Sequence, residues 1–499
     1  MNILQAKDEI KKTIEIYLEK DEFGDYKIPI MKQRPVFMIG APGIGKTAIV
    51  EQIAKEMRIA LVAYSMTHHT RQSAIGLPFI TEHQYGGESV KVSQYTMSEI
   101  IASAFDAIEQ TGMENGILFL DEINCVSETL APAILQFLQY KTFGNRELPK
   151  GWIVVSAGNP PQYNRSVREF DIATKDRLKC LNIVEDFDVW KKYAYDAMVH
   201  GAIIAFLEVN KNWFYSVHMT PDGASFATAR GWEDLSFAIK MYEFKGFDVD
   251  IITVQQYITD EDIARKFTVF YDLYKKYRED YQIEAILKGK CSVDVMQKAE
   301  KASFDERIAL MELLYETLNV DIVRVLEEHK FLSVLAKELR EIKKETGKGK
   351  NTLSGLLEIK TEHLRRALNN NLKIQSKSDN DAMIKTIRTL EAYAETLKSN
   401  KSEDFELIKK AFDKKAAEHA NTMKTVSGEF EAVIEFVEDA WKTGRELGYY
   451  MTILTIGEQS TEFIALQGSE GYFRNNKFLL AYDLMENLKN EILELDISI

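Results

Sequence analysis

Eight residues near the N-terminus combine glycines, a lysine and a threonine at a spacing that suits phosphate binding. Glycines let successive backbone N–H groups curl around phosphates, and the N-terminus of a following helix adds a favourable dipole. The lysine would reach the β- and γ-phosphates of a nucleotide, and the threonine hydroxyl would ligate Mg²⁺. The predicted nucleotide-binding residues, with the first helical residue after the loop, are Gly40, Ala41, Pro42, Gly43, Ile44, Gly45, Lys46, Thr47 and Ala48.

The residues on both sides of this loop predict the elements that would position it. Residues 35–39 form a short β-branched and aromatic run that is typical of a strand, and residues 48–57 carry apolar side chains at helical spacing. Strand, glycine loop and helix in this order are the context that marks a phosphate loop. The alternative is a glycine turn that binds no nucleotide.

Two adjacent carboxylates, Asp121 and Glu122, follow a second apolar run at residues 116–120. Open α/β sheets bind ligands at the carboxyl ends of their strands, so these side chains would lie near the phosphate loop. We expect Asp121 to hold magnesium directly or through water, and Glu122 to polarise the attacking water as a general base. Acidic residues often end strands, and the prediction therefore depends on the phosphate loop about 75 residues earlier.

Asn159 ends a further apolar run, residues 152–158. Its amide can donate and accept hydrogen bonds, so it could contact the γ-phosphate or position water. The alternative is that Asn159 and Pro160 only begin a turn.

The order of these runs predicts a doubly wound α/β fold. Strands are expected at 35–39, 59–64, 116–120, 152–158 and 180–184, after a first helix within 2–20, and each strand ends near a candidate ligand. Two β-like runs around Gly86 and Gly87, within residues 77–92, predict a hairpin inserted between a strand and a helix at 97–111.

From Phe187 onward we expect helices and no further strands, with loops and helix starts around residues 218–221 and 228–231. Apolar side chains at three-four spacing predict long amphipathic helices beyond residue 290. Residues 451–457 could be a strand or the end of a buried helix. The predicted division is a nucleotide-binding core at 1–186, a helical lid at 187–290 and a helical C-terminal domain at 291–499.

Composition limits the classes of function. A net charge of −14 argues against a non-specific nucleic-acid binder, which needs a positive surface. No apolar run reaches the roughly 20 residues of a membrane span, and the N-terminus has no apolar signal core. Three widely spaced cysteines suggest neither a disulfide framework nor a zinc site, so we expect a reducing cytoplasm.

The series of motifs within residues 35–235 resembles an AAA+ ATPase and, within that superfamily, the MoxR family. The hairpin around Gly86 resembles the helix-two insert of the clade that includes the magnesium-chelatase ATPase subunit. The segments that carry the resemblance are 40–47, 118–122, 156–160, 176–178 and 228–233.

The resemblance implies roles for three further residues. Asn159 matches the first sensor, Arg177 the arginine finger supplied to a neighbouring subunit, and Arg230 the second sensor in the lid. A guanidinium is always charged and binds two phosphate oxygens at once, so these roles suit arginine. Two neighbours of these arginines depart from the common family pattern. They are Leu178, which follows the finger position, and the pair Thr228-Ala229, which precedes the second-sensor position. Arg165 and Arg168 are alternative candidates for the finger.

The resemblance also implies an activity and partners. We expect a homo-oligomeric ring, with a hexamer as the expected form and the ring size left open, that hydrolyses ATP with Mg²⁺. Its role would be that of a chaperone that remodels a protein client, beside a partner with a von Willebrand factor A domain. The alternatives are a nucleic-acid translocase of restriction type and a nucleotide-gated scaffold.

Overall fold

The computed structural model describes residues 1–68, 71–86, 88–143, 146–163, 167–220, 223–346, 352–371, 376–399, 404–442 and 444–476. The chain forms two compact units. Unit 1 consists of Met1–Val189 with Thr228–Arg230, and unit 2 of Trp190–Ala227 with Gly231–Ile499. No helix among the described residues is long and apolar enough to cross a membrane.

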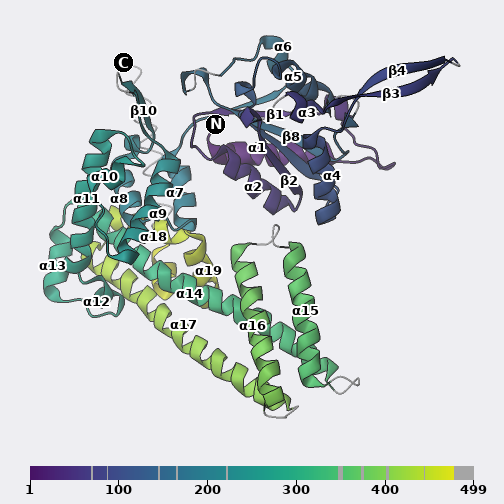
Figure 1. The fold of residues 1–499 in the computed structure, drawn as a ribbon. Helices are drawn as coiled ribbons and strands as arrows, with labels where there is room; N and C mark the ends of the chain where they lie inside the picture. Colours follow the sequence, from purple (N-terminus) through teal and green to yellow (C-terminus); the bar gives the residue numbers. More distant parts are fainter. Residues whose placement is uncertain are drawn as a thin grey trace. The chain divides into compact units, whose positions relative to one another are not determined.

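A five-stranded parallel sheet forms the centre of unit 1 (Figure 1). Its strands occur in the order β2, β5, β8, β1, β9, so β1 lies between β8 and β9. Their bounds are Ala60–Ser65 for β2, Gly116–Asp121 for β5, Trp152–Gly158 for β8, Val36–Gly40 for β1 and Lys179–Ile183 for β9. All five predicted strands are confirmed, with ends that differ by at most one residue.

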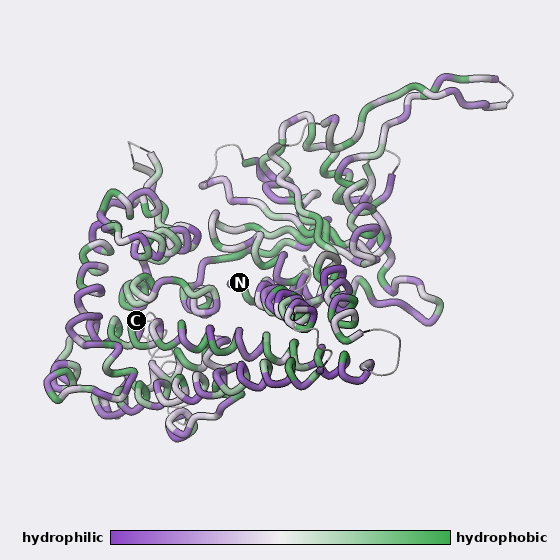
Figure 2. The backbone as a smooth tube through the Cα atoms, turned by 60° about the horizontal axis from the view of Figure 1, so that its bottom comes forward, coloured by the Kyte–Doolittle hydropathy of each residue, from purple (hydrophilic) through white to green (hydrophobic). Residues whose placement is uncertain are grey.

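The sheet is an apolar layer that helices cover. Every residue of β8 is buried, and β5 is buried up to Leu120, as expected for central parallel strands. Figure 2 shows these strands mostly in the hydrophobic colour. Unit 1 also contains the helices α1 (Ile3–Leu18), α2 (Lys46–Met57), α3 (Arg71–Ile75), α4 (Glu99–Thr111), α5 (Ala131–Tyr140) and α6 (Ile172–Lys175), and the start of α7 (Phe187–Asp196).

The predicted hairpin insert is present in unit 1. Strands β3 (Pro78–Tyr85) and β4 (Glu88–Tyr95) pair antiparallel with Tyr85 opposite Glu88, and the ribbon projects from the unit (Figure 1). Gly86 follows β3 directly, and Gly87 lies outside the described residues. A second, shorter hairpin of β6 (Thr142–Phe143) and β7 (Arg146–Glu147) was not expected from the sequence.

The described residues of unit 2 form helices and one hairpin as their regular elements. The expectation that strands end before Phe187 is wrong, because β10 (Ser216–Thr220) and β11 (Gly223–Ala227) pair antiparallel. His218 therefore lies on a strand rather than in a loop. Each strand has only five residues, which is too few for an alternating pattern to stand out from the surrounding helical periodicity.

The remaining elements of unit 2 are helices. The ambiguous segment 451–457 is largely helical, because α18 extends to Ile456. The proposed boundary at residue 290 between a lid and a C-terminal domain stays a prediction. The helices are α8 (Gly201–Val209), α9 (Ala229–Lys245), α10 (Ile251–Gln255), α11 (Glu261–Asp280), α12 (Ile283–Leu287), α13 (Val293–Lys301), α14 (Phe304–Glu345), α15 (Leu353–Asn371), α16 (Lys377–Ser399), α17 (Phe405–Trp441), α18 (Arg445–Ile456), α19 (Glu458–Gln467) and α20 (Glu470–Asn475).

Candidate functional site

The glycine loop joins the carboxyl end of β1 to the start of α2. Gly43 and Gly45 have φ angles of 76° and 90°, in the left-handed region where a side chain would be strained. Gly45 is the N-cap of α2, and no side chain caps the helix there. The first N–H groups of α2 are thus available to an anion, and the positive end of the helix dipole favours one.

Lys46 is a buried cation within this loop, with 8% of its surface exposed. Its Nζ donates hydrogen bonds to the carbonyl oxygens of Gly40 and Ala41, both at 2.8 Å, and to Oδ1 of Asn159 at 2.9 Å. Burial lowers the pKa of Lys46 to about 8, although the carboxylate of Asp121 opposes the shift. All three acceptors are neutral, so an anionic phosphate would be a better partner for the ammonium group.

The hydroxyl of Thr47 donates to Oδ2 of Asp121 at 3.0 Å, and the backbone N–H of Glu122 donates to Oδ1 of Asp121 at 2.9 Å. A hydroxyl and a carboxylate oxygen side by side fit Mg²⁺, which binds few protein ligands and completes its shell with phosphate oxygens and water. Among the described residues, no group of three or more His, Cys, Asp or Glu side chains could hold a metal by itself. The donor set therefore fits magnesium that arrives with a nucleotide.

Glu122 stands at a strained position directly after β5. Its φ angle is 53°, which is uncommon for a residue with a side chain and often marks a functional site. Its Oε2 accepts hydrogen bonds from Thr67 Oγ1 at 3.0 Å and from Ser65 Oγ at 3.4 Å. These hydroxyls hold the carboxylate in one orientation beside Asp121.

The sequence analysis missed Ser65 and Thr67, although a signal for them exists. Ser65 is the last residue of β2 and lies opposite Asp121 in the parallel pairing of β2 with β5. A polar residue at the carboxyl end of a strand is a candidate site residue, because ligands bind at that edge of the sheet. This argument was applied to Asn159 and applies equally to Ser65.

Asn159 follows β8 and contacts two neighbours. Its side chain accepts from Lys46, and its backbone carbonyl accepts from Nδ2 of Asn124 at 2.8 Å. A Cβ on Gly158 would lie 2.3 Å from Oδ1 of Asn124, so only glycine allows this close approach. Asn124, a third residue that the sequence analysis missed, thus fixes the position of Asn159.

Arg230 lies in unit 1 beside the loop, although the rest of α9 belongs to unit 2. A Cβ built on Gly43 would be 3.5 Å from the Cβ of Arg230. The positive charge of Arg230 also contributes to the lowered pKa of Lys46, after burial and the opposing effect of Asp121. Arg230 therefore lies near the phosphate loop, and its role as the second sensor stays a prediction.

Arg177 lies at the other edge of the sheet. Lys179 pairs with Val36 at the start of β1, whereas the loop follows Gly40, which pairs with Ile183. Four residues of strand separate these two edges by about 13 Å. The exposed Arg177 donates to the carbonyl oxygen of Ala173 at 3.0 Å.

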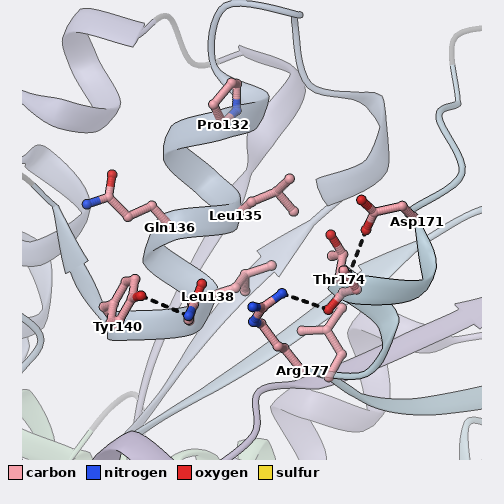
Figure 3. A pocket seen from close by; sticks show the side chains of 11 residues that line it. Pro132, Leu135, Gln136, Leu138, Tyr140, Asp171, Thr174 and Arg177 are labelled. Carbon is pink, nitrogen blue, oxygen red and sulfur yellow. Dashed lines mark hydrogen bonds between the residues drawn. The ribbon is translucent and has the colours of Figure 1, made fainter.

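A hollow of about 370 Å³ between α5 and α6 surrounds the Arg177 side chain (Figure 3). Its lining is mixed, with the apolar side chains of Leu135 and Leu138 and the polar ones of Gln136 and Asp171.

The two alternative finger residues differ in what the structure describes. The backbone N–H of Arg168 donates to the carbonyl of Asn124 at 2.9 Å, and its side chain forms an ion pair with Glu128. Arg165 lies outside the described residues.

The structure therefore brings Lys46, Thr47, Asp121, Glu122 and Asn159 together at the carboxyl edge of the sheet, with Arg230 nearby, and keeps Arg177 apart from them. The grouped residues could bind a nucleotide triphosphate with magnesium and orient a water molecule toward it.

Comparison with known proteins identifies the same region. Residues 35–178 match the AAA domain (dynein-related subfamily). No curated protein is significantly similar to the chain.

Two solved structures of RuvB variants from Thermotoga maritima are 14% and 13% identical. They cover 56% and 58% of this chain and 77% of each RuvB chain, with TM-scores of 0.29. At that TM-score we draw nothing from the likeness. The matched range and the parallel sheet show that the chain carries an AAA domain with an AAA+ fold, which supports nucleotide hydrolysis, followed by a large helical region.

Proposed function

We propose that the chain is an ATPase that works as a ring, in which each nucleotide site is completed by an arginine from the next subunit. Lys46 and the N-terminus of α2 bind the phosphates, and Thr47 and Asp121 hold the magnesium ion. Magnesium supplies charge neutralisation at the phosphate oxygens when it is bound.

Hydrolysis requires a water molecule in line with the γ-phosphate. Glu122 orients this water and accepts its proton, while the hydroxyls of Ser65 and Thr67 hold the carboxylate in position. Asn159 shares a hydrogen bond with Lys46 and can turn its amide toward the γ-phosphate. The strained backbone of Glu122 supports this role, because strain persists where the surrounding structure requires it.

The observation that carries the ring proposal is the separation of Arg177 from the phosphate loop. An arginine side chain does not span the about 13 Å length of β1, which supports a role for Arg177 at a nucleotide that another copy of the chain holds. In this role the guanidinium leaves the carbonyl of Ala173 and binds the phosphate oxygens of the neighbouring site.

The finer assignment rests on the resemblance stated above. We propose that the protein is a MoxR-type chaperone, that its ring is a hexamer, and that it remodels a protein client together with a partner that has a von Willebrand factor A domain. Copurification from the native cell tests these partners directly. Copurification of nucleic acid without any protein partner would favour the translocase instead.

Mixing two inactive variants tests the shared site. Arg177→Ala removes the finger, and Glu122→Gln removes the water-orienting carboxylate, so each homogeneous ring should lose ATP turnover. A one-to-one mixture contains interfaces in which the Arg177→Ala copy holds ATP and the Glu122→Gln copy supplies the finger. Random assembly should restore about a quarter of the wild-type rate.

Arg168→Ala tests the alternative finger, because it removes the other described candidate from the same part of unit 1 and leaves Arg177 in place. It should keep turnover in a homogeneous ring. A mixture that assembles but stays inactive at every ratio would exclude Arg177 as a residue shared between copies.

A further inference from the structure

The longest described helix of unit 2, α14, lies within the predicted C-terminal domain, and its first half contacts helices of the predicted lid. Helix α14 has 42 residues, which corresponds to a length of about 63 Å. Its two halves pack against different parts of the unit. The first half combines a buried apolar surface with hydrogen bonds to tyrosines of other helices, and the second half belongs to a separate apolar core.

Three glutamates in the first half of α14 accept hydrogen bonds from tyrosines of other helices. Glu312 lies at the centre, with no exposed surface. Its Oε1 accepts from Tyr195 of α7 at 2.6 Å and from Tyr449 of α18 at 2.8 Å. We call these three residues the Glu312 joint. Hydrogen bonds to a carboxyl group that is shielded from water are costly to lose, so the joint ties α7 and α18 to α14.

Two further bonds tie α11 to the same half of α14. Tyr274 donates to Oε2 of Glu316 at 3.1 Å, and Tyr281, which caps α11, donates to Oε1 of Glu306 at 2.7 Å. Helices α7 and α11 both belong to the predicted lid, so their attachment to α14 crosses the predicted boundary at residue 290.

Helix α8 adds close apolar packing to these bonds. Every residue from Gly201 to Leu207 is buried, which is the pattern of a helix surrounded by protein on all sides. A Cβ on Gly201 would lie 2.3 Å from the hydroxyl of Tyr274 and 2.7 Å from Oε2 of Glu316. The absence of a side chain at Gly201 therefore permits the close approach of the lid helix to α14.

The second half of α14 belongs to a separate apolar core. This core contains the side chains of Phe331, Leu335 and Leu339 from α14, together with residues of α15, α16 and the start of α17. Lys360 of α15 bridges back to Glu338 of α14 at 2.8 Å. We call α15 and α16, packed on this end of α14, the distal helices.

We propose that the predicted lid and all of α14 move as one rigid lever, which carries a nucleotide-driven rotation of the lid to the distal helices. The inference rests on the proposed function, because ATP turnover supplies the rotation. A rotation of about 10° would displace the end of a 63 Å helix by about 11 Å. The distal helices would then be the part of the chain that displaces a client.

Distances between spin labels in the full chain test the lever. The three native cysteines, Cys125, Cys180 and Cys291, are first replaced by serine in a background that retains ATP turnover. Labels are then attached to cysteines at exposed positions: Glu109→Cys in α4 of unit 1, Asp262→Cys in α11 of the lid and Ala392→Cys in the distal α16. Each pair is measured without nucleotide and with a non-hydrolysable ATP analogue.

The lever predicts that the distance between positions 262 and 392 stays constant when the analogue binds, while the distance between positions 109 and 392 changes by several ångströms. A change between 262 and 392 as large as that between 109 and 392 would overturn it, because the arm would then bend. No change in either pair, with analogue binding verified in the same sample, would also overturn it.

Removal of the joint supplies a second measurement. Tyr195→Phe combined with Tyr449→Phe removes both hydrogen-bond donors to Glu312. This double variant should broaden the distance distribution between positions 262 and 392. Tyr277→Phe in α11 is the matched control. An unchanged distribution would show that the joint does not stiffen the lever. ATP turnover by the labelled chains separates this outcome from a failure of the proposed function, which would abolish turnover itself.

Discussion

Two clusters of carboxylates in this molecule have opposite surroundings. Asp121 and Glu122 in unit 1 stand at the end of a strand, partly exposed, beside a lysine and hydroxyl groups. Glu312 in unit 2 is fully buried, and tyrosine hydroxyls are its hydrogen-bond donors. The first set lies open to a ligand that brings its own charge, whereas the second is closed by protein. Exposure and the type of partner, rather than the number of acidic groups, distinguish a reactive site from a structural joint.

The same contrast between a ligand-binding group and a structural group applies to two buried lysines of unit 1. Their variants give the largest predicted difference. Lys46 and Lys141 both have a pKa that burial lowers to about 8. Lys46→Ala should abolish nucleotide binding, because it removes the only side-chain cation of the phosphate loop. Equilibrium binding of a fluorescent ATP analogue measures the effect.

Lys141→Met is the matched control. Lys141 donates to Oε1 of Gln33 at 2.9 Å, and its loss should lower the melting temperature while the affinity for nucleotide stays within about twofold. Unchanged binding in Lys46→Ala would contradict the assignment of the loop.

The two glutamates give the next test. Glu122→Gln should keep ATP binding and lower turnover by about 10²–10³-fold, because an amide cannot accept the proton of the attacking water. Steady-state phosphate release and analogue binding measure the two quantities separately. Glu312→Gln should leave both quantities unchanged. Equal losses of turnover in the two variants would erase the distinction between the clusters.

Glu312 also gives the stability of unit 2 a dependence on pH. Burial raises the pKa of Glu312 to about 7, although the hydrogen bonds from Tyr195 and Tyr449 and the charge of Lys191 in α7 oppose the shift, and Glu208 in α8 adds to it. A carboxyl group whose pKa is raised by folding binds more protons in the folded state. Stability should therefore fall as the pH rises from about 4.5 to about 7 and stay level above that range, by a few kcal/mol in all.

Denaturant titrations between pH 5 and pH 8 would measure this slope. Glu312→Gln should flatten it and should be more stable than the wild type at pH 8, since the amide accepts both hydrogen bonds without a buried charge. A variant that keeps the full slope would assign the pH dependence to other groups.

Thr67→Ala gives the smallest predicted effect. It removes one of two hydroxyls that donate to Glu122, and Ser65 remains at 3.4 Å. We expect a decrease in turnover of about 3- to 10-fold, in line with the loss of one hydrogen bond. Tyr163→Phe in unit 1 serves as a neutral control. A rate equal to that of the wild type would mean that the hydroxyl does not orient the carboxylate.

Local patterns predicted the sheet and most of the candidate site. The loop at 40–47, the pair Asp121 and Glu122, and Asn159 each follow their own strand, so neighbouring residues in sequence were enough to find them. Ser65, Thr67 and Asn124 were missed because their roles depend on which strands are neighbours. That information appears only in the order β2, β5, β8, β1.

The features of unit 2 were harder to predict for the same reason. Tyr195 and Tyr449 are 117 and 137 residues away from Glu312 in the chain. Helical periodicity predicts that each residue lies on its own helix, but it does not predict which helices are neighbours. The β10–β11 hairpin is short and lies between long helices, where no local signal exceeds the helical pattern.

Unit 1 is discontinuous in the chain, because Thr228–Arg230 return to it after an excursion of 38 residues through unit 2. During synthesis, all five strands leave the ribosome well before the residue that lies beside Gly43. A nascent chain that ends at Val189 can close its sheet but has no Arg230 next to the phosphate loop. Nucleotide affinity should consequently rise near the middle of translation, once the first part of the lid has emerged.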